Sequence, residues 1–199
     1  MKKLRYLFGT IVFILTAAVA AFAQMKGAWK QTTPDGKTTV MICSDNYLMI
    51  TRYKEKEFLY TEGGTYSFHE GMLAYISEFN SADTSKVGKT MHIKTTISGS
   101  KLLTEGLGEW QQIDNASSAA AANYRITGRM GENGSITQMQ RGARKTLKLL
   151  TDTHFQWAAI NPQTKQFSGT GAVLTPSKME NIPKKLSFSA GTITVWELL

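Results

Sequence analysis

The side chains that could do acid-base or metal chemistry are few and widely spaced. The chain holds three histidines, His69, His92 and His154, and one cysteine, Cys43. No pair of histidines has the H-x-x-x-H spacing that places two imidazoles on one metal ion, and a single thiol adds too little for a zinc site. The sequence also has no nucleophile elbow and no phosphate-binding loop. We therefore expect no catalytic site, no metal site and no cofactor, and hence a protein that is not an enzyme.

Asp152 and His154 come nearest to a catalytic pair. A carboxylate beside an imidazole could orient the ring as a general base. Both residues, however, stand where a polar segment precedes an apolar one, and Thr151-Asp152 repeats the pattern of Ser44-Asp45. Side chains of these types hydrogen-bond to their own backbone in turns. We interpret both segments as turns.

Large apolar and aromatic side chains are more abundant than catalytic groups between residues 47 and 79. Inside a small β-barrel they either fill the core or line a site for one small ligand. Tyrosine favours a site, because each buried phenol needs a hydrogen-bond partner. The residues expected to line the interior and contact a ligand are Tyr47, Met49, Tyr53, Phe58, Tyr60, Tyr66, Tyr75 and Phe79. Plain core packing is the competing interpretation.

Short strands separated by turn residues must position these side chains. Thr38 to Cys43 is β-branched and apolar, Tyr47 to Tyr53 follows a Ser-Asp-Asn turn, and residues 90–98 alternate between apolar and polar. Glu62-Gly63-Gly64 indicates a bulge within a strand. Eight short strands fit between residues 24 and 114, where no helical periodicity persists. The sequence therefore predicts an all-β, antiparallel up-and-down barrel.

The stretch from Thr38 to Phe68 returns at residues 145–175. The corresponding segments are Ile42-Cys43-Ser44-Asp45-Asn46-Tyr47-Leu48 and Leu149-Leu150-Thr151-Asp152-Thr153-His154-Phe155. Phe58 then corresponds to Phe167, and Gly64 to Gly171 after a two-residue insertion. A stretch that recurs indicates a folding unit that recurs.

The repeat divides the mature chain into two β units of unequal length. We expect a first barrel at residues 24–114, a linker at 115–123 and a second, truncated unit of the same type at 124–199. The second unit is about two strands short. It either stays an open barrel with exposed edges or closes by pairing with the first unit or with another chain.

Gly27-x-Trp29 on the expected first strand, the eight-strand meander and the segment Leu149 to Trp157 together resemble the lipocalin-like secreted proteins of unknown function found in gut bacteria. The resemblance implies a calycin-type β-barrel that holds a small apolar molecule. It also implies that Trp29 plugs the closed end of the barrel, where Trp110 on the last strand would pack beside it. The second unit departs from the family pattern at Ala172-Val173-Leu174, so we expect the ligand in the first unit.

The first 23 residues have the parts of a signal peptide. Lys2, Lys3 and Arg5 precede an apolar run at residues 7–20, and Ala21-Phe22-Ala23 is a small-x-small cleavage site. We expect cleavage near Ala23, with the mature chain secreted or periplasmic. The alternative is an uncleaved anchor, since the apolar run nearly reaches the roughly 20 residues of a membrane span.

Charge divides unevenly between the two units. Residues 24–115 carry ten Lys and Arg against eleven Asp and Glu, whereas residues 116–199 carry ten against four. The basic second half is either a solvated face or a surface for an anionic partner such as a lipid headgroup. No zinc spacing, basic helix or RNA-binding aromatic signature favours nucleic acid.

Together these features favour an exported, non-catalytic protein whose first barrel binds a small hydrophobic or amphipathic molecule. The alternative is a structural or adhesive envelope protein, in which the edges of the second unit pair with another protein or with a second copy of the chain. A membrane surface is a further expected partner, contacted without being spanned.

Overall fold

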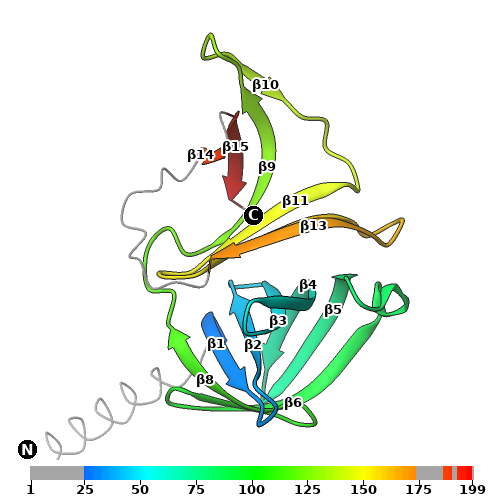
Figure 1. The fold of residues 1–199 in the computed structure, drawn as a ribbon, viewed down its shortest axis with the longest axis vertical. Coiled ribbons are helices and arrows are strands. Elements are labelled where there is room, and N and C mark those ends of the chain that lie inside the picture. Colours follow the sequence, from blue (N-terminus) through cyan, green and yellow to red (C-terminus); the bar gives the residue numbers. More distant parts are fainter. Residues whose placement is uncertain (1–24, 174–185, 190–191, 199) are drawn as a thin grey trace, which may run out of the picture.

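The fold is described by a computed structural model, which covers residues 25–173, 186–189 and 192–198 (Figure 1). The expected signal peptide, residues 1–23, lies outside the described residues. The described part contains fifteen β-strands and one 3-10 turn, so the predicted all-β class is confirmed. No helical segment in this part has the length and apolar character that a transmembrane span requires.

The first unit is a closed barrel of eight antiparallel strands. Each strand pairs with the next one along the chain, and β1 pairs with β8 to close the barrel. The strands are β1 (Gly27–Thr32), β2 (Lys37–Cys43), β3 (Tyr47–Lys54), β4 (Glu57–His69), β5 (Met72–Asn80), β6 (Thr90–Ser98), β7 (Lys101–Thr104) and β8 (Gly108–Asp114). The 3-10 turn η1 (Thr84–Lys86) lies between β5 and β6. The predicted up-and-down barrel is confirmed.

Strand β6 shows how alternation divides side chains between the core and the solvent. Met91, Ile93 and Ile97 pack against the apolar cluster inside the barrel. His92 and Lys94, on the opposite face, are exposed. Successive side chains of a strand point to opposite faces, so this alternation fixes which residues line the interior.

A bulge lies at the predicted place, with Gly63 and Gly64 of β4 opposite an extra residue on β5. The register between β4 and β5 shifts there, which leaves Glu78 without a directly paired residue. A Cβ on Gly64 would lie 1.9 Å from the carbonyl oxygen of Ile76, so only glycine fits. The extra residue reverses the faces of β5: Tyr75 belongs to the interior cluster, whereas Phe79 belongs to a cluster outside the barrel.

The second unit is an open sheet of seven strands. Its order is β13-β12-β11-β9-β15-β14, and the short β10 also pairs with β9. The strands are β9 (Asn123–Met130), β10 (Ile136–Gln138), β11 (Lys145–Leu150), β12 (Phe155–Asn161), β13 (Gln166–Val173), β14 (Leu186–Ser189) and β15 (Thr192–Leu198). Among the described residues, no strand pairing joins this sheet to the barrel.

The strand order of the second sheet reproduces that of the barrel with two strands left out. Around the barrel the neighbours run β4-β3-β2-β1-β8-β7, and β13-β12-β11-β9-β15-β14 follows the same connectivity. Strands β5 and β6 have no counterpart in the described part of the second unit. This order agrees with the predicted shortening by about two strands.

The hairpin β11-β12 repeats the hydrogen bonds of the hairpin β2-β3. In the first hairpin, the N–H of Ser44 donates to the carbonyl of Tyr47 at 2.9 Å, and in the second the N–H of Thr151 donates to the carbonyl of His154 at 2.8 Å. The Ser44 hydroxyl also donates to the carbonyl of Tyr47, and the Thr151 hydroxyl to the carbonyl of His154, each at 3.2 Å. The predicted turns are confirmed, and the two loops have one conformation.

The strand after this hairpin follows the predicted equivalence only in part. Phe58 and Phe167 pair with corresponding residues of β3 and β12, as predicted. Gly171 occupies the position of Glu62 and not that of Gly64. The two-residue insertion in the turn before β13 displaces the whole strand, so the predicted equivalence of the two glycines is wrong.

The two units pack through the outer faces of corresponding strands. Val40 and Ile42 on β2 lie in one buried cluster with Leu147 and Leu149 on β11. Beside them the ring of Phe79 stacks on that of Phe167, with centroids 5.8 Å apart. The outer face of β2 and β3 is therefore a second apolar core.

A buried glutamine crosses the same interface. The side-chain carbonyl of Gln156 accepts from the Thr51 hydroxyl at 2.9 Å. Its amide donates to the Thr61 hydroxyl oxygen at 2.7 Å and to that of Thr170 at 3.2 Å. Because buried polar groups need partners, this set fixes how β12 sits on β3 and β4.

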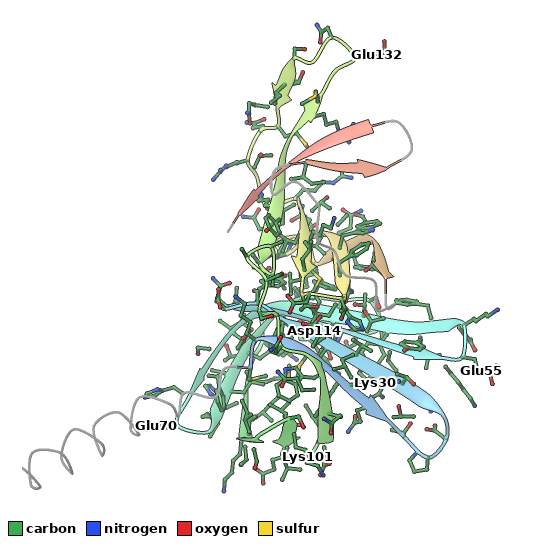
Figure 2. The ribbon with its side chains drawn as sticks, turned by 90° about the vertical axis from the view of Figure 1, so that its left-hand side faces the viewer. Lys30, Glu55, Glu70, Lys101, Asp114 and Glu132 are labelled. Carbon is green, nitrogen blue, oxygen red and sulfur yellow. The ribbon has the colours of Figure 1, made fainter. Side chains whose placement is uncertain are left out.

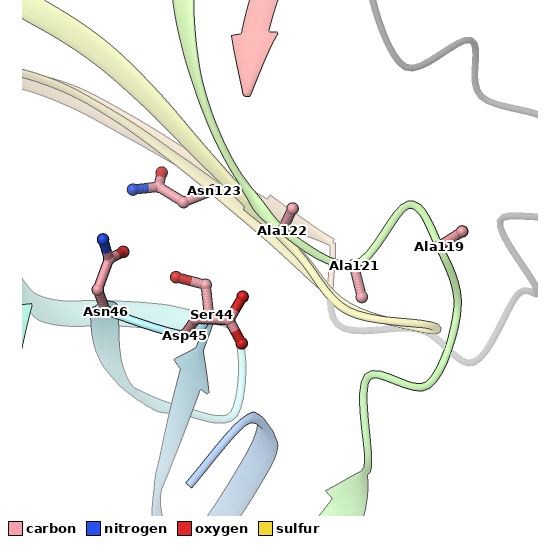
Figure 3. Close-up of a pocket in the computed structure, with 7 residues that line it drawn as sticks. All are labelled: Ser44, Asp45, Asn46, Ala119, Ala121, Ala122 and Asn123. Atoms are coloured by element: carbon pink, nitrogen blue, oxygen red, sulfur yellow. The ribbon is translucent and has the colours of Figure 1, made fainter. Parts of the chain in front are cut away.

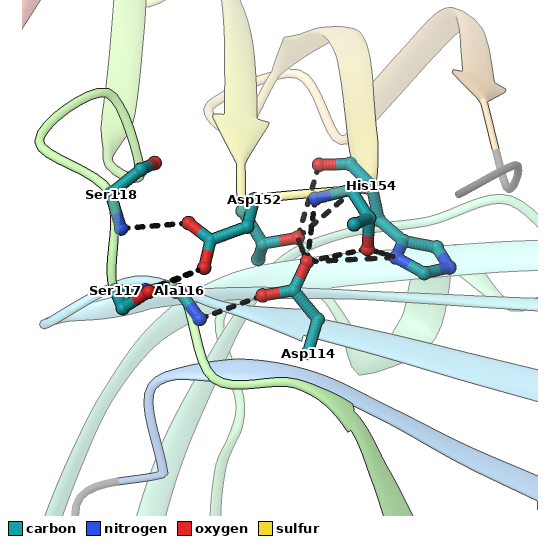
Figure 4. A network of polar contacts seen from close by, with 8 residues as sticks. Asp114, Ala116, Ser117, Ser118, Asp152 and His154 are labelled. Atoms are coloured by element: carbon teal, nitrogen blue, oxygen red, sulfur yellow. Dashed lines mark hydrogen bonds and ion pairs between the residues drawn. The ribbon is translucent and has the colours of Figure 1, made fainter. Parts of the chain in front are cut away.

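Asp114 clamps the end of the barrel to the β11-β12 loop (Figures 2 and 4). Its carboxylate accepts from the Thr151 hydroxyl at 2.8 Å, from both the N–H and the hydroxyl of Thr153 at 2.6 Å, and from the N–H of Ala116 at 2.7 Å. Burial opposes ionisation of Asp114, but the hydrogen bonds from His154, Thr153, Ala116 and Thr151 outweigh it and lower the pKa of the carboxyl.

The connector between the units is held by a second carboxylate in the same network. Asp152 accepts from the N–H and the hydroxyl of Ser117, at 2.9 and 2.8 Å, and from the N–H of Ser118 at 2.7 Å. The expected linker at 115–123 is therefore tied to the second unit along this stretch.

Replacing Asp114 with alanine should destabilise the protein by about 2 to 4 kcal/mol at pH 7, since several charge-assisted hydrogen bonds are lost together. The pKa of Asp114 is lowered on folding, so its contribution is present above about pH 4 and is lost as the pH falls through the lower folded value. Urea unfolding at pH 7 and at pH 3 measures this, and the difference from wild type should shrink at pH 3. Glu109→Ala, which breaks an exposed pair with Lys101, is the control and should cost less than about 1 kcal/mol.

Replacing Leu149 with alanine tests the core between the units. Leu149 is fully buried there, so the substitution should cost about 2 to 5 kcal/mol. Leu103→Ala is the matched control, because Leu103 is 55% exposed. Calorimetry should show both units of the wild type unfolding in one transition; equal, small effects of the two variants would contradict the docked arrangement.

Candidate ligand-binding site in the first barrel

Cross-strand pairing shows which of the predicted ligand contacts face the barrel interior. Tyr66 and Tyr75 belong to the interior cluster, and Tyr60 pairs with the inward-facing Arg52. The remaining five face outward: Tyr47, Met49, Tyr53, Phe58 and Phe79. Their expected interior position is wrong, because the inward residues of β3 are Leu48, Ile50 and Arg52.

The outward residues serve the contact between the units. Tyr47 donates its hydroxyl proton to Glu78 at 2.7 Å, and Glu78 forms an ion pair with Lys145 of the second unit at 2.8 Å. Met49, Phe79 and Tyr53 pack in the apolar core between the units, whereas Phe58 is 49% exposed. Burial, followed by the charge of Glu78, raises the pKa of Tyr47.

Trp29 and Trp110 both lie inside the barrel. The indole N–H of Trp29 donates to the carbonyl of Met25 at 2.8 Å, and that of Trp110 donates to the Thr104 hydroxyl oxygen at 3.0 Å. Both rings belong to the interior apolar cluster and are buried. Their polar atoms are therefore satisfied within the protein, which suits a structural role.

Part of the apolar interior is accessible to solvent. Trp29, Leu48 and Leu102 are at most 1% exposed. Five other inward-facing side chains are only partly buried: Ile50, Phe68, Met91, Ile93 and Ile97. Inward-facing side chains keep such exposure near the ends of a barrel or beside unfilled interior space. The partly buried side chains form an apolar surface that a small molecule could cover.

A cluster of polar and charged side chains on β3, β4 and β5 lies next to this surface. The guanidinium of Arg52 stands over the ring of Tyr60, 5.4 Å from its centroid, and its Nε donates to the Thr39 hydroxyl oxygen at 2.9 Å. Glu62, which pairs with Ile50, accepts from the side-chain amide of Asn80 at 2.9 Å. An inward-facing cation and an inward-facing carboxylate thus lie beside partly buried apolar residues.

The environment of Glu62 penalises its charge. Burial raises the pKa of this carboxyl, and the hydrogen bond from Asn80 with the positive charges of Lys86 and Arg52 offsets only part of the effect. Perturbed ionisable groups in concave sites are candidates for function. Here the group can accept hydrogen bonds, and when protonated it can also donate one.

Tyr75 places an unused hydroxyl in the same interior. Its oxygen is buried and makes no hydrogen bond of good geometry among the described residues, although the Ser77 side chain is close enough to lower the pKa of the phenol in part. Burial, followed by the charge of Glu62, raises the pKa of Tyr75, so the phenol stays neutral. A buried hydroxyl without a partner costs stability unless a ligand or water satisfies it.

Sequence reasoning did not identify Arg52, Glu62 and Asn80 as interior residues. Tyr47 to Tyr53 is apolar at both alternating phases, so its pattern does not say which face points inward. The pairing of Arg52 with Thr39 and Tyr60 would have indicated the inward face, but this pairing is known only once the strand register is known.

The described part of the second unit has no equivalent of this polar cluster. Ala159, Gly169 and Gly171 occupy the positions of Arg52, Tyr60 and Glu62. The indole of Trp157 covers this place, since a Cβ on Gly171 would lie 2.4 Å from its Nε1. The candidate site therefore belongs to the first unit alone.

The possible catalytic pair forms no dyad. Asp152 binds the connector, and His154 instead has its Nδ1 3.8 Å from the carboxylate of Asp114 and 2.7 Å from the Thr153 hydroxyl oxygen. His154 is buried in this junction (Figure 4). Within the described residues, no group of three or more His, Cys, Asp or Glu side chains could hold a metal ion.

Replacing Glu62 with glutamine should stabilise the protein at pH 8. Glutamine keeps an oxygen for Asn80 and removes the buried charge. Because folding raises the pKa of Glu62, its contribution to stability is fully present below about pH 4 and is lost as the pH rises through the folded value. The melting temperature of Glu62→Gln should exceed that of wild type at pH 8 and match it at pH 4. Glu57→Gln, at the exposed start of β4, is the control, and a lower melting temperature for Glu62→Gln at pH 8 would contradict a buried charge.

Comparison with known proteins does not assign this chain to a family. No family model, no curated protein and no solved structure matches it. The barrel and its interior are therefore the basis for a functional proposal.

Proposed function

We propose that the chain is an exported, non-catalytic protein that binds one small amphipathic molecule in its first barrel. The observation that carries this is the partly exposed apolar interior beside Arg52, Glu62 and the buried hydroxyl of Tyr75. Ligand sites are mostly apolar with a few polar groups that fix orientation. The interior of the first barrel has this composition.

The arrangement favours a ligand with an apolar body and a polar end. The apolar body would lie against Ile50, Met91 and Ile93, which solvent reaches in the free protein. The polar end would meet Arg52 and Glu62. It would accept a hydrogen bond from the guanidinium and donate one to the carboxylate. A wholly apolar molecule would remove water from these charges and leave them only the partners they already have, Thr39 and Asn80, which costs affinity.

Export and a calycin-type relationship are part of the same proposal. The basic, apolar and small-residue segments of residues 1–23 support cleavage near Ala23. The eight-stranded up-and-down barrel with an inward-facing Trp29 on β1 supports the lipocalin-like relationship. The mature N-terminus, read by mass spectrometry of protein recovered from periplasm or medium, tests the export.

Native mass spectrometry of protein purified from its own host tests ligand binding. An added mass that an organic extract releases would support the proposal. Met91→Trp, which fills partly exposed interior space, should abolish the added mass, whereas Ile76→Trp on the exposed outer face of the neighbouring strand should retain it. Ligand-free wild type that also fails to bind a fluorescent amphiphile such as anilinonaphthalene sulfonate would argue against the barrel as a binding site.

Replacing Tyr75 with phenylalanine should weaken binding of the extracted ligand by about five- to tenfold, the usual worth of one hydrogen bond. The melting temperature should change little, because the hydroxyl makes no hydrogen bond of good geometry in the free protein and has only the Ser77 side chain near it. Titration calorimetry and thermal unfolding together measure both effects. A large loss of stability with unchanged affinity would assign the hydroxyl to the core.

A second candidate function is a structural role through strand pairing. Among the described residues, β13 pairs only with β12 and β14 only with β15, so the sheet ends where β5 and β6 would have counterparts. Strand edges accept further strands from a partner. Size-exclusion chromatography with light scattering distinguishes the candidates, since a stable dimer or a co-purifying protein would favour the structural role.

A further inference from the structure

A hollow of about 230 Å³ lies between the β2-β3 loop of the first unit and the end of the connector (Figure 3). Small side chains such as Ala119, Ala121 and Ala122 form much of its wall. Its carboxylate, Asp45, already forms an ion pair with Lys26 at 3.5 Å. These groups do not select a ligand, and the stronger feature outside the barrel lies on the second unit.

The second unit carries an arm, residues 128–144, which is formed by the end of β9, by β10 and by the segment that leads to β11. Figure 1 shows this arm at the end of the molecule opposite the first barrel, and Figure 2 shows Glu132 at its tip. In the described part of the chain, β10 pairs only with β9, from Gly128 to Met130. One edge of β10 therefore has no neighbouring strand there.

Most side chains of the arm are exposed. No residue from 131 to 142 is buried, and all three residues of β10 are exposed. Ile136 is 49% exposed and Met139 is 45% exposed. An isolated two-stranded ribbon is marginally stable in water, and exposed apolar side chains rimmed by charge mark contact surfaces. Packing among the described residues does not account for these two side chains.

Hydrogen bonds hold the segment after β10 against β9. The N–H of Met139 donates to the carbonyl of Thr127 at 2.7 Å, and the guanidinium of Arg125 donates to the carbonyl of Gly142 at 2.8 Å. Ile136 and Met139 are an odd number of positions apart, so they lie on opposite faces of the ribbon. A partner that contacts both must therefore approach the free edge of β10.

The arm and its base are strongly basic. Residues 125–145 hold five Lys and Arg, which is half of the ten in residues 116–199, and their one acidic residue is Glu132. The side chains of Arg129, Arg141 and Arg144 are exposed. The positive charge of the second unit is therefore concentrated where Ile136 and Met139 are exposed.

Cations and exposed apolar side chains along one edge favour an anionic lipid surface over a soluble polyanion. A soluble polyanion would pair with the arginines and leave Ile136 and Met139 in water. At a bilayer, the headgroups contact the arginines while the apolar side chains reach the boundary with the acyl chains. The open edge of β10 limits the depth to the headgroups, because backbone groups without partners do not enter the hydrocarbon region.

We propose that the arm docks on the surface of a bilayer that contains anionic phospholipid. Arg129, Arg141 and Arg144 contact the lipid phosphates, and Ile136 and Met139 enter the headgroup layer. The docking adds a membrane partner to the proposed function and does not depend on the barrel site.

Sedimentation with lipid vesicles tests the docking, with a chain that begins at Gln24 and so holds the whole described fold. Vesicles of equal parts phosphatidylglycerol and phosphatidylcholine should bind this chain at about 50 mM salt, and vesicles of phosphatidylcholine alone should not. Arg129→Gln combined with Arg144→Gln should weaken binding roughly twentyfold, since each basic residue near an anionic surface contributes about fivefold. Lys54→Gln combined with Lys94→Gln removes two exposed charges from the first barrel, and this matched control should bind as wild type does.

Ile136→Ser combined with Met139→Ser tests the apolar part of the contact. This double variant should bind the anionic vesicles roughly tenfold more weakly, because less apolar surface leaves water, and should bind heparin as wild type does. Leu103→Ser combined with Leu107→Ser is the matched control, since both leucines are exposed on the first barrel. It should bind the vesicles with unchanged affinity.

Three results would overturn the proposal. They are no binding of wild type to the anionic vesicles, equal binding by wild type and the double arginine variant, or unchanged vesicle binding by the Ile136 and Met139 variant, which would assign the arm to soluble polyanions. If a variant does not fold, hydrogen exchange of wild type decides instead: anionic vesicles should slow exchange in residues 136–142, and unchanged exchange there would count against docking. Met91→Trp, which fills the barrel, should dock as wild type does, so failure of the barrel site can be told apart from failure of the arm.

Discussion

The fold depends on strands β2 and β3 being buried on both faces. Met41 and Leu48 point into the barrel, while Ile42 and Met49 point into the core shared with the second unit. A strand pair in an antiparallel barrel usually presents one face to water, and its sequence then alternates. Here both phases are apolar, because each face has a core to fill.

This shared core explains how a sheet that lacks two strands can be stable. An isolated open sheet would have to bury an apolar face of its own. The second unit instead buries Leu147, Leu149, Ala158 and Ile160 against the first barrel. The Asp114 clamp and the Gln156 bridge fix the orientation of the docked sheet, because each satisfies polar groups on both units.

The sequence sufficed for the strands, the bulge and the repeat, but not for the direction in which β3 faces. Turn chemistry at Ser44 and Thr151 and the glycines at the bulge act locally, so they could be predicted from short segments. Which face of a strand points inward depends on tertiary packing. Assigning Tyr47 and Met49 to the interior assumed that the largest side chains fill the barrel. These two side chains instead pack in the second core, which forms between segments about a hundred residues apart.

The difference between the two units bears most directly on where a ligand binds. The hairpin loops and register of both units agree, so their backbones offer equivalent positions. At these positions the first unit carries Arg52 and Glu62 beside partly exposed apolar residues, whereas the second carries small residues under the ring of Trp157. An inward-facing carboxylate with a raised pKa opposes folding, and stability alone would favour the arrangement of the second unit. The charged side chains of the first unit are therefore the feature on which the proposed binding role depends.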